Sequence, residues 1–243
     1  MSRVVSGVNP VREALAARPD QIEVVCYASK DQSRLSKLLE SCKKARVKVS
    51  ACDKKQLDRF AGSHNHQGIA AIISDFSYSE IDDILNFCKK SGEKAFILVL
   101  DGIQDPHNLG AIIRSAESAG IHGIIIPTDR AVHVTSTVEK VSAGAVEHIK
   151  IAKVTNIART LEDLKKEGLW IIGAEGGSRT CLYDVDLTVH VVIVVGSEGK
   201  GVRPLVQKKC DIMVNIPMAG KINSLNVSVS SAIIMYEAVR QRL

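Results

Sequence analysis

Residues 215–240, NIPMAGKINSLNVSVSSAIIMYEAVR, join a polar loop to an apolar helix. The loop contains a proline, a glycine and several short polar residues, which favour turns. At 3.6 residues per turn the second half is apolar on nearly every side, and such a helix is expected to be buried. Val227 and Ile234 fall on one face, and Val229 and Tyr236 fall on the opposite face. The loop therefore stands on a rigid support at a helix N-terminus, where a ligand is expected to bind.

Apolar runs precede this stretch throughout the second part of the chain. They lie at residues 95–100, 121–126, 169–173, 189–195 and 211–216. Continuous runs of this length are typical of strands that are covered on both faces, as in parallel sheets. Helical patterns separate most of them, at residues 109–119, 157–166 and 202–209. The pattern predicts an open α/β sheet that binds ligands beyond the carboxyl ends of its strands.

The first 75 residues carry a separate α/β pattern. Helices are predicted at residues 8–17, 33–45 and 53–60, and strands at residues 21–28, 47–51 and 68–74. This alternation predicts a small domain over residues 1–75. A polar linker with a short helical run is predicted at residues 76–93, and the larger domain at residues 94–243.

The distribution of charge also separates the two parts. Residues 1–75 contain 13 Lys or Arg and 8 Asp or Glu, whereas the remaining residues contain 19 of each. The positive excess predicts that the N-terminal domain binds a polyanion such as a nucleic acid, with an ordinary solvated surface as the alternative. Aromatic residues make up only 4% of the chain, so base stacking is not the main expected mode of recognition.

Other features point to a soluble protein of the cytoplasm. The chain has no run of eighteen apolar residues and no secretory signal pattern at its N-terminus. Its six cysteines are scattered without a CxxC motif, as expected for reduced thiols. His64 and His66 lack a nearby third ligand, so their loop is interpreted as a polar or RNA-contacting surface rather than a zinc site.

Three loops that follow strand ends carry the polar residues of interest. The first is DGIQDPHNLGAIIRSAESAG, residues 101–120, in which Asp105-Pro106 fits a turn and Asn108 can cap the next helix. Arg114 points about 160° away from the apolar stripe of that helix, towards solvent, a cleft or a partner subunit. Asn108 and Arg114 lie about 9 Å apart along the helix axis and could bracket one nucleotide.

The second loop is VVGSEGKGVRP, residues 194–204. Its glycines permit a tight turn with backbone exposed to a ligand, and Glu198 lies at the crest. The spacing matches neither a P-loop nor a GxGxxG motif. The third loop opens the stretch quoted first, with Ser224 as the candidate N-cap and Asn226 at the helix entrance. Each loop alone is a weak signal, but the three together at the ends of three strands are specific.

These loops resemble the three signature motifs of the SpoU (TrmH-type) ribose 2′-O-methyltransferases of the SPOUT superfamily. Residues 105–114 match Asp-Pro-x-Asn-x-Gly-x-x-x-Arg, and residues 196–201 match Gly-x-Glu-Gly-x-Gly. Residues 216–220 and 224–228 match Ile-Pro-Met-x-Gly and Ser-Leu-Asn-Val-Ser. The likeness covers the full length, because the first 75 residues resemble the small RNA-binding domain of the family. The length and the ending YEAVRQ are most similar to members that methylate a guanosine of 23S rRNA.

The resemblance implies a fold that the apolar pattern did not predict. The expected fold class is α/β, with a mostly parallel SPOUT domain after the small α/β RNA-binding domain. The SPOUT domain should form a homodimer, and its final segment should thread through a loop to make a trefoil knot, which is a very rare topology.

The resemblance also implies a cofactor and its contacts. S-adenosylmethionine should bind bent in the knot, and no metal is expected. Its adenine should lie against the main chain near Gly196, Ile216 and Leu225, with Met218 close by.

The expected reaction is methyl transfer to a ribose 2′-hydroxyl. By the resemblance, Asn108 would orient the ribose or Arg114, and Glu198 would hold its loop and the nucleotide. Ser224 and Asn226 would shape the pocket. The family proposal makes Arg114 the base, but a guanidinium seldom gives up its proton. We therefore favour a role in which Arg114 grips a phosphate and stabilises the developing alkoxide.

Three alternatives remain open at the level of sequence. A tRNA ribose methyltransferase would have the same active site. A non-catalytic RNA-binding or ribosome-assembly factor would not require all of Asn108, Arg114, Glu198 and Asn226. A nucleotide-binding α/β enzyme is disfavoured because no known phosphate loop is present. The expected partner is RNA, specifically 23S rRNA, and neither DNA nor a membrane.

Overall fold

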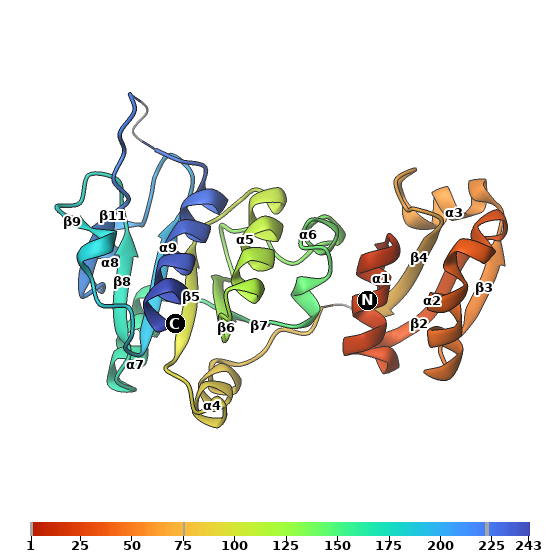
Figure 1. Cartoon of the computed structure of the whole chain (residues 1–243), viewed down its shortest axis with the longest axis horizontal. Helices are drawn as coiled ribbons and strands as arrows, with labels where there is room; N and C mark the ends of the chain where they lie inside the picture. The colour runs from red at the N-terminus through yellow and green to blue at the C-terminus, as the bar shows by residue number, and fades with distance from the viewer. Residues whose placement is uncertain (1, 75, 222–223) are drawn as a thin grey trace. The chain divides into compact units, whose positions relative to one another are not determined.

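The computed structural model describes residues 2–74, 76–221 and 224–243 (Figure 1). Two compact units are present. The first comprises Met1–Ser77 and Val134–His148, and the second comprises Tyr78–His133 and Ile149–Leu243. The predicted domain boundary at Asp75 lies outside the described residues.

The first unit contains a four-stranded sheet in the order β1-β4-β2-β3. Its strands are β1 (Ser2–Ser6), β2 (Ile22–Ala28), β3 (Val49–Cys52) and β4 (Ile69–Ser74). β4 pairs antiparallel with β1 and β2, whereas β2 and β3 are parallel. The predicted elements of this unit are confirmed with their ends shifted by at most two residues. β1 was not predicted.

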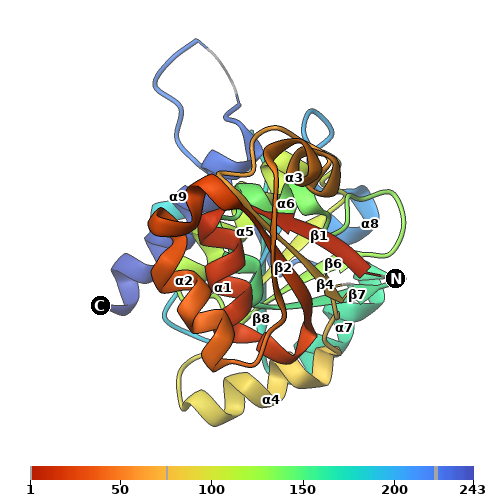
Figure 2. The same cartoon turned by 90° about the vertical axis from the view of Figure 1, so that its right-hand side faces the viewer.

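Helices cover both faces of this sheet (Figure 2). They are α1 (Val8–Ala17), α2 (Gln32–Lys44) and α3 (Lys54–Ala61), with the short helices η1 (Pro19–Gln21) and η2 (Ser29–Asp31). α1 and α2 share one apolar core, and Leu57 of α3 packs on the other face. The later segment contributes α6 (Ser136–Val141) and η3 (Ala145–Glu147), where Glu147 pairs with Arg18 at 3.3 Å.

The second unit is built on a seven-stranded sheet in the order β7-β6-β5-β10-β8-β11-β9, and all neighbouring strands are parallel. The strands are β5 (Phe96–Asp101), β6 (Gly123–Pro127), β7 (Lys150–Val154), β8 (Trp170–Ala174), β9 (Thr180–Cys181), β10 (Val191–Gly196) and β11 (Ile212–Asn215). The parallel sheet predicted from the five apolar runs is confirmed. β7 was missed because Lys150 and Lys153 interrupt its apolar pattern, and β9 because it is only two residues long.

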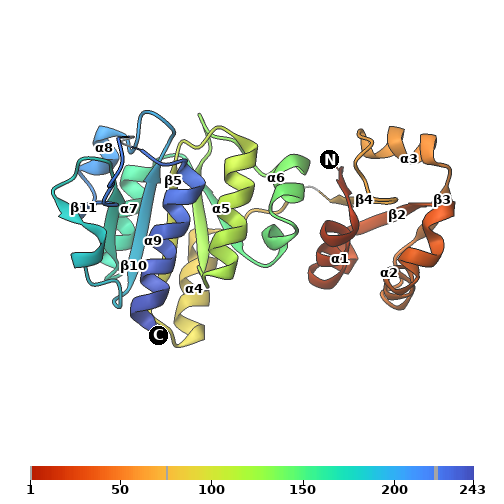
Figure 3. The ribbon, with the colours of Figure 1, turned by 45° about the horizontal axis from the view of Figure 1, so that its top comes forward.

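Helices form a layer on each face of this sheet (Figure 3). One layer contains α4 (Ile81–Ser91), α7 (Ile157–Lys166) and α8 (Pro204–Gln207), whose apolar residues share a core with the strands. The other layer contains α5 (Pro106–Ser118) and α9 (Val227–Arg242), which pack together. The short helix η4 (Leu182–Asp184) follows β9. α4 lies inside the predicted linker, yet its Ile84 and Cys88 are buried in the core, so these residues are part of the second unit.

The final helix differs from the sequence prediction. Val227, Ile234 and Ala238 are buried as expected, but Val229 is 47% exposed and Tyr236 is 49% exposed. The prediction of a helix buried on all sides is therefore wrong for the single chain, because α9 covers the sheet with one face and none of the described residues covers Val229 and Tyr236 on the other. None of the helices in the described part of the chain is long and apolar enough to cross a membrane.

The strand order brings the C-terminal segment back across the sheet. β11 pairs with β8 on the side away from β10, whereas α9 contacts α5 and β10. The chain after β11 must therefore return over the carboxyl edge of the sheet. Strand order does not decide whether this segment passes through a loop, and the trefoil knot stays a prediction.

Candidate active site

The central strands create a crevice at the carboxyl edge of the second sheet. β5 and β10 are neighbours, and Gly196 at the end of β10 pairs with Asp101 at the end of β5. The chain leaves β5 towards β6 on one side and leaves β10 towards β11 on the other. Loops that diverge in this way leave a crevice at the switch point, where open α/β sheets bind their ligands.

The helix after β5 begins earlier than the sequence predicted. Its N-cap is Asp105, whose carboxylate accepts a hydrogen bond from His107 N at 2.8 Å. Pro106 follows at the first helical position, where its fixed φ is favourable. The prediction that Asn108 caps this helix is therefore wrong. Because Asp105 satisfies the helix end, the Asn108 amide is available for contacts with other loops.

Asn108 connects two loops that are far apart in the sequence. Its Oδ1 accepts a hydrogen bond from Asn226 Nδ2 at 3.1 Å, and its Nδ2 donates to Glu198 Oε1. Asn226, not Ser224, is the N-cap of α9, and its Oδ1 accepts from Ser228 N at 2.9 Å and from Ser228 Oγ at 2.6 Å. The structure thus brings together Asn108, Glu198 and Asn226, one from each predicted motif.

The hydrogen bonds of this cluster all run in one direction. Each group donates to the next, from the first turn of α9 through Asn226 and Asn108 to the Glu198 carboxylate. This chain of hydrogen bonds begins at the N-terminus of α9, which carries a partial positive charge, and ends at the negatively charged carboxylate of Glu198. In such an arrangement the hydrogen bonds polarise one another. The cluster therefore holds the exposed Glu198 in a defined orientation at the mouth of the crevice.

The other two predicted catalytic residues lie apart from this cluster. Arg114 is exposed on α5, about 120° around the helix from Asn108. Ser224 is exposed two residues before the cap of α9. Within the described residues no hydrogen bond joins either side chain to the cluster.

The loop after β10 requires glycine for steric reasons. A Cβ on Gly196 would lie 1.9 Å from the carbonyl carbon of Gly201. The loop closes through Ser197 N to Gly201 O at 3.2 Å and Gly201 N to Ser197 O at 2.9 Å. Gly199, at its tip, has a φ of 74°, in the left-handed region that favours glycine. This tight closure presents Glu198 towards Asn108.

Asp101, at the end of β5, anchors the same loop through Arg203. It was not predicted as a functional residue. Its side chain is fully buried, and Oδ2 accepts from Arg203 N at 2.8 Å while Oδ1 accepts from Arg203 Nε at 2.7 Å. A buried carboxylate is stable only when it is paired in this way. An acidic residue at the end of an entirely apolar strand was the signal in the sequence that could have revealed it.

Arg203→Ala is expected to lower the free energy of unfolding by about 3 kcal/mol, because the buried carboxylate loses its guanidinium and keeps only the hydrogen bond from the main-chain N at position 203. It should also lower catalytic turnover about tenfold, since Asp101 would hold the loop that carries Glu198 through this one bond only. Chemical denaturation and initial rates measure the two effects. Lys209→Ala is the control, because it removes only an exposed pair with Glu162. Equal losses in both variants would contradict the anchoring role.

Asn108→Asp tests the direction of the hydrogen-bond chain. The substitution keeps the shape of the side chain but replaces the donor to Glu198 with a second carboxylate. We expect about a tenfold to hundredfold loss of turnover and a thermal midpoint within a few degrees of the wild type, because the cluster is solvent-exposed. Asn108→Ser, which can donate, should retain more activity. A fully active Asn108→Asp variant would show that the donor is unnecessary.

The predicted cofactor residues gather at the same edge. Gly196 ends β10, Ile216 is half-buried after β11, and Met218 and Leu225 are each 39% exposed. Exposed apolar side chains beside a turn with accessible backbone suit a ligand that has a flat apolar ring and polar edges.

His66 serves a structural purpose in the first unit. Its side chain is buried, its Nδ1 accepts a hydrogen bond from Gly68 N at 3.0 Å, and its Nε2 lies 2.7 Å from Asp58 Oδ1. This contact lowers the pKa of Asp58. Interpreting the whole loop as RNA-contacting is therefore wrong for His66, although His64 is exposed. Over the described ranges, no group of three or more His, Cys, Asp or Glu side chains could hold a metal ion.

A doubly covered parallel sheet with a polar cluster at its switch point defines an α/β enzyme with its site at the carboxyl edge. Residues 95–236 match the SpoU rRNA Methylase family, and residues 4–79 match the family described as RNA 2′-O ribose methyltransferase substrate binding. The chain belongs to the SpoU methylase family, and it is an RNA 2′-O-ribose methyltransferase of the TrmH/SpoU type.

Known relatives match over nearly the whole chain. A Bacillus subtilis (strain 168) protein named for the TrmH family of tRNA/rRNA methyltransferases is 40% identical over 98% of this chain and 95% of its own length. The AdoMet complex of the SpoU methyltransferase AviRb from Streptomyces viridochromogenes aligns with a TM-score of 0.84 at 24% identity, over 99% of this chain and 90% of that one. An AdoMet-bound rRNA methyltransferase from Sinorhizobium meliloti aligns with a TM-score of 0.81 at 22% identity, over 100% and 88%. At these identities the two structures establish the fold.

Proposed function

We propose that this protein transfers a methyl group from S-adenosylmethionine to the ribose 2′-hydroxyl of a guanosine in 23S rRNA. The observation that carries the proposal is the hydrogen-bonded cluster of Asn108, Glu198 and Asn226 at the switch point. Residues 1–75 would bind RNA and residues 94–243 would catalyse the reaction, in the cytoplasm.

The carboxyl edge of the second sheet suits the proposed cofactor. Gly196 would offer its backbone to the adenine, and Ile216, Met218 and Leu225 would supply apolar contacts. When bound, the sulfonium supplies an electrophilic methyl group, so the protein has only to align the acceptor and manage its proton. The AviRb and Sinorhizobium meliloti structures, which hold AdoMet, support this choice.

The cluster and Arg114 would have different roles in binding the nucleotide and in the reaction. Asn226 and Asn108 fix the Glu198 carboxylate, which would accept a hydrogen bond from the nucleotide and hold it against the crevice. Arg114 would grip the phosphate and stabilise the alkoxide that develops on the 2′-oxygen. A guanidinium is a poor base, so the hydroxyl proton would leave to phosphate or water. Ser224 would shape the edge of the pocket.

A homodimer would complete this site. Val229 and Tyr236 are seven residues apart on α9 and expose one apolar stripe, which is suited to a second copy of the same helix. Arg114 lies exposed on α5, the helix packed beside α9. We propose that each protomer supplies Arg114 to its partner's cluster.

Tyr236→Arg is expected to shift the protein from dimer to monomer and to lower activity by at least about tenfold, because a charge would be buried in the apolar interface. Sedimentation and initial rates measure both effects.

Mixing Arg114→Ala with Asn108→Ala should restore about a quarter of wild-type activity, because half of the dimers are mixed and have one complete site. A mixture without activity, despite exchange of subunits, would place Arg114 in its own protomer's site.

Two observations favour rRNA over tRNA as the substrate. The basic first 75 residues and the match over almost the full length favour rRNA, yet the Bacillus relative is named for both tRNA and rRNA. The alternative is a tRNA ribose methyltransferase with the same cluster. A non-catalytic RNA-binding factor is disfavoured, because binding alone would not need Asn108 oriented between Glu198 and Asn226.

The test is to incubate the purified protein with S-adenosylmethionine and unmodified 23S rRNA or tRNA, with and without EDTA. Digestion and mass spectrometry then quantify each 2′-O-methylnucleoside. We expect 2′-O-methylguanosine to rise in rRNA only and to be unaffected by EDTA. A rise in tRNA only would replace the substrate, and an EDTA-sensitive rate would contradict the metal-free mechanism. Cofactor binding without methylation of either RNA would favour the binding factor.

A further inference from the structure

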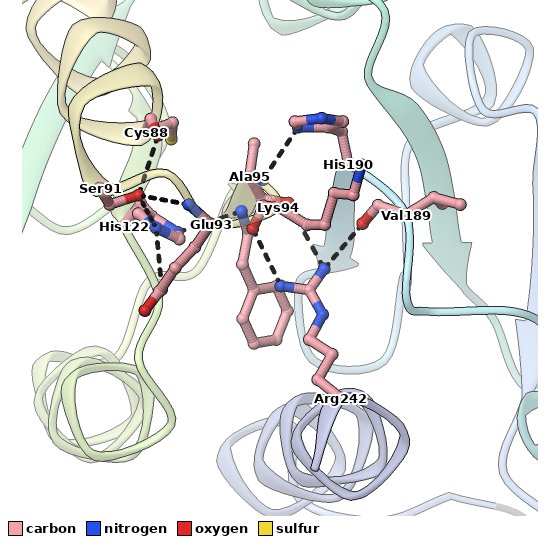
Figure 4. Close-up of polar contacts among 10 residues, drawn as sticks. Cys88, Ser91, Glu93, Lys94, Ala95, His122, Val189, His190 and Arg242 are labelled. Atoms are coloured by element: carbon pink, nitrogen blue, oxygen red, sulfur yellow. Dashed lines mark hydrogen bonds and ion pairs between the residues drawn. The ribbon is translucent and has the colours of Figure 1, made fainter.

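The last residue of α9 is held at the opposite edge of the second sheet. Arg242 donates hydrogen bonds from Nε to Leu187 O at 2.9 Å and from Nη1 to Lys94 O at 3.1 Å. Its Nη2 donates to Val189 O at 2.9 Å and to Ala95 O at 3.4 Å. Figure 4 shows the side chain reaching from α9 to the carbonyl groups of Lys94, Ala95 and Val189. The guanidinium carbon also lies 4.4 Å from the centre of the Phe96 ring.

These contacts leave Arg242 little capacity to bind a ligand. Four of the five N–H groups of a guanidinium are engaged, and the ring occupies one of its faces. Burial lowers the pKa of Arg242. The side chain therefore acts on the protein itself, by binding two segments of main chain to one helix end.

The two segments lead into the strands that carry the candidate site. Lys94 and Ala95 precede β5, and residues 187–189 precede β10. β5 ends at Asp101 and continues into the loop before Asn108, while β10 ends at Gly196 and continues into the loop of Glu198. Arg242 thus holds together the amino ends of the two strands whose carboxyl ends form the crevice.

The opposite end of α9 contacts the site directly. Asn226 caps the helix and donates to Asn108, and 16 helical residues separate this cap from the C-terminus, about 24 Å along the axis. β5 has six residues and spans about 20 Å. The helix and the strands therefore have similar lengths. One end of α9 is attached to the segments that lead into β5 and β10, and the other end is joined through Asn108 to the loops that follow these strands.

Neighbouring residues strengthen the attachment at the far end. Gln241 Nε2 donates to Val185 O at 3.1 Å, and its Oε1 accepts from Leu187 N at 2.8 Å. Glu237, which is buried, accepts from Gln241 Nε2 at 2.7 Å and from Arg240. These contacts order the last turn of the helix, where an isolated helix would fray.

We infer that Arg242 is a positioning residue for the active site: by fixing the far end of α9 on β5 and β10, it sets the axial position of the helix and so places Asn226 against Asn108. This inference rests on the proposed function for its effect on the rate, but its effect on the helix stands on the contacts alone. A displacement of about 1 Å at a catalytic group can cost up to a hundredfold in rate.

The test compares Arg242→Ala and Arg242→Lys with the control Arg159→Ala in the full chain. Arg159 is exposed on α7, in the helix layer on the other face of the sheet, so its loss should leave the position of α9 unchanged. For Arg242→Ala we expect turnover to fall about tenfold with the KM for RNA unchanged. Asn226 is displaced from Asn108, whereas the surface of the protein that binds RNA is not altered. Arg242→Lys should be intermediate, because an ammonium has three donors in place of the planar fork.

Amide hydrogen exchange separates this effect from a local loss of structure. In Arg242→Ala, exchange in the first turn of α9, residues 227–231, should rise about tenfold, and it should stay at the wild-type rate in Arg159→Ala. Faster exchange confined to residues 238–243, with normal turnover, would overturn the inference. A wild-type protein that methylates no RNA would refute the proposed function, while the exchange measurement would still test the connection through α9.

Discussion

Arg114→Ala should lower the turnover number for methyl transfer by about a thousandfold, while the affinity for S-adenosylmethionine stays within about twofold of the wild type. Removing a charged group that stabilises a developing oxyanion costs two to three orders of magnitude, and loss of the phosphate contact adds to it. Single-turnover kinetics with saturating RNA measure the first quantity, and calorimetry measures the second. Cofactor binding is expected to survive because the proposed contacts of Arg114 are with the phosphate and the 2′-oxygen of the RNA rather than with the cofactor.

Two further variants sharpen this test. Arg114→Lys keeps the charge but loses the planar donor fork, and we expect it to recover at most about a tenth of the activity. Arg159→Ala removes an exposed arginine from α7, in the other helix layer, and should be fully active. Near-normal turnover of Arg114→Lys would contradict a bidentate contact with phosphate.

Gly196→Ala should abolish measurable binding of S-adenosylmethionine. The added Cβ would lie far inside van der Waals contact with three backbone atoms, at 1.9 Å from Gly201 C, 2.1 Å from Gly201 O and 2.1 Å from Val202 N. Backbone cannot rotate away as a long side chain can, so the loop must move and take Glu198 away from Asn108. Calorimetric titration with the cofactor checks the expectation, with circular dichroism to confirm that the protein is folded.

Gly177→Ala is the control for backbone strain without a clash. Gly177 has a φ of 89°, but a Cβ there would meet nothing within 4 Å. This substitution should cost about 1–2 kcal/mol in stability and leave cofactor binding intact. If Gly196→Ala bound the cofactor as well as Gly177→Ala does, the close approach of the loop would be irrelevant to the site.

Much of the architecture could be predicted from local patterns of apolar and polar residues in the sequence. Continuous apolar runs predicted the buried parallel strands, because a strand covered on both faces must be apolar at every position. The motifs at residues 105–114, 196–201 and 216–228 predicted which loops meet, and the structure joins Asn108, Glu198 and Asn226. These predictions succeeded because strand burial and loop composition depend on neighbouring residues and the carboxyl ends of parallel strands share one edge.

Other features depend on residues that are distant in the sequence. Asp101 and Arg203 are 102 positions apart, so no local pattern pairs the buried carboxylate with its guanidinium. The two-sided attachment of α9 likewise requires β5 and β10 to be neighbours, which apolar runs do not specify.

The amino-acid sequence by itself determined the α/β class, the positions of the strongly apolar strands and the polar residues of the three loops, because local periodicity and turn chemistry encode them. The tertiary structure alone decided that Asp101 pairs with Arg203, and that Val229 and Tyr236 remain exposed. The pairing depends on which strand and loop are neighbours, and burial depends on what lies opposite a helix face. Both are properties of three-dimensional neighbours, which the composition of a single segment does not contain.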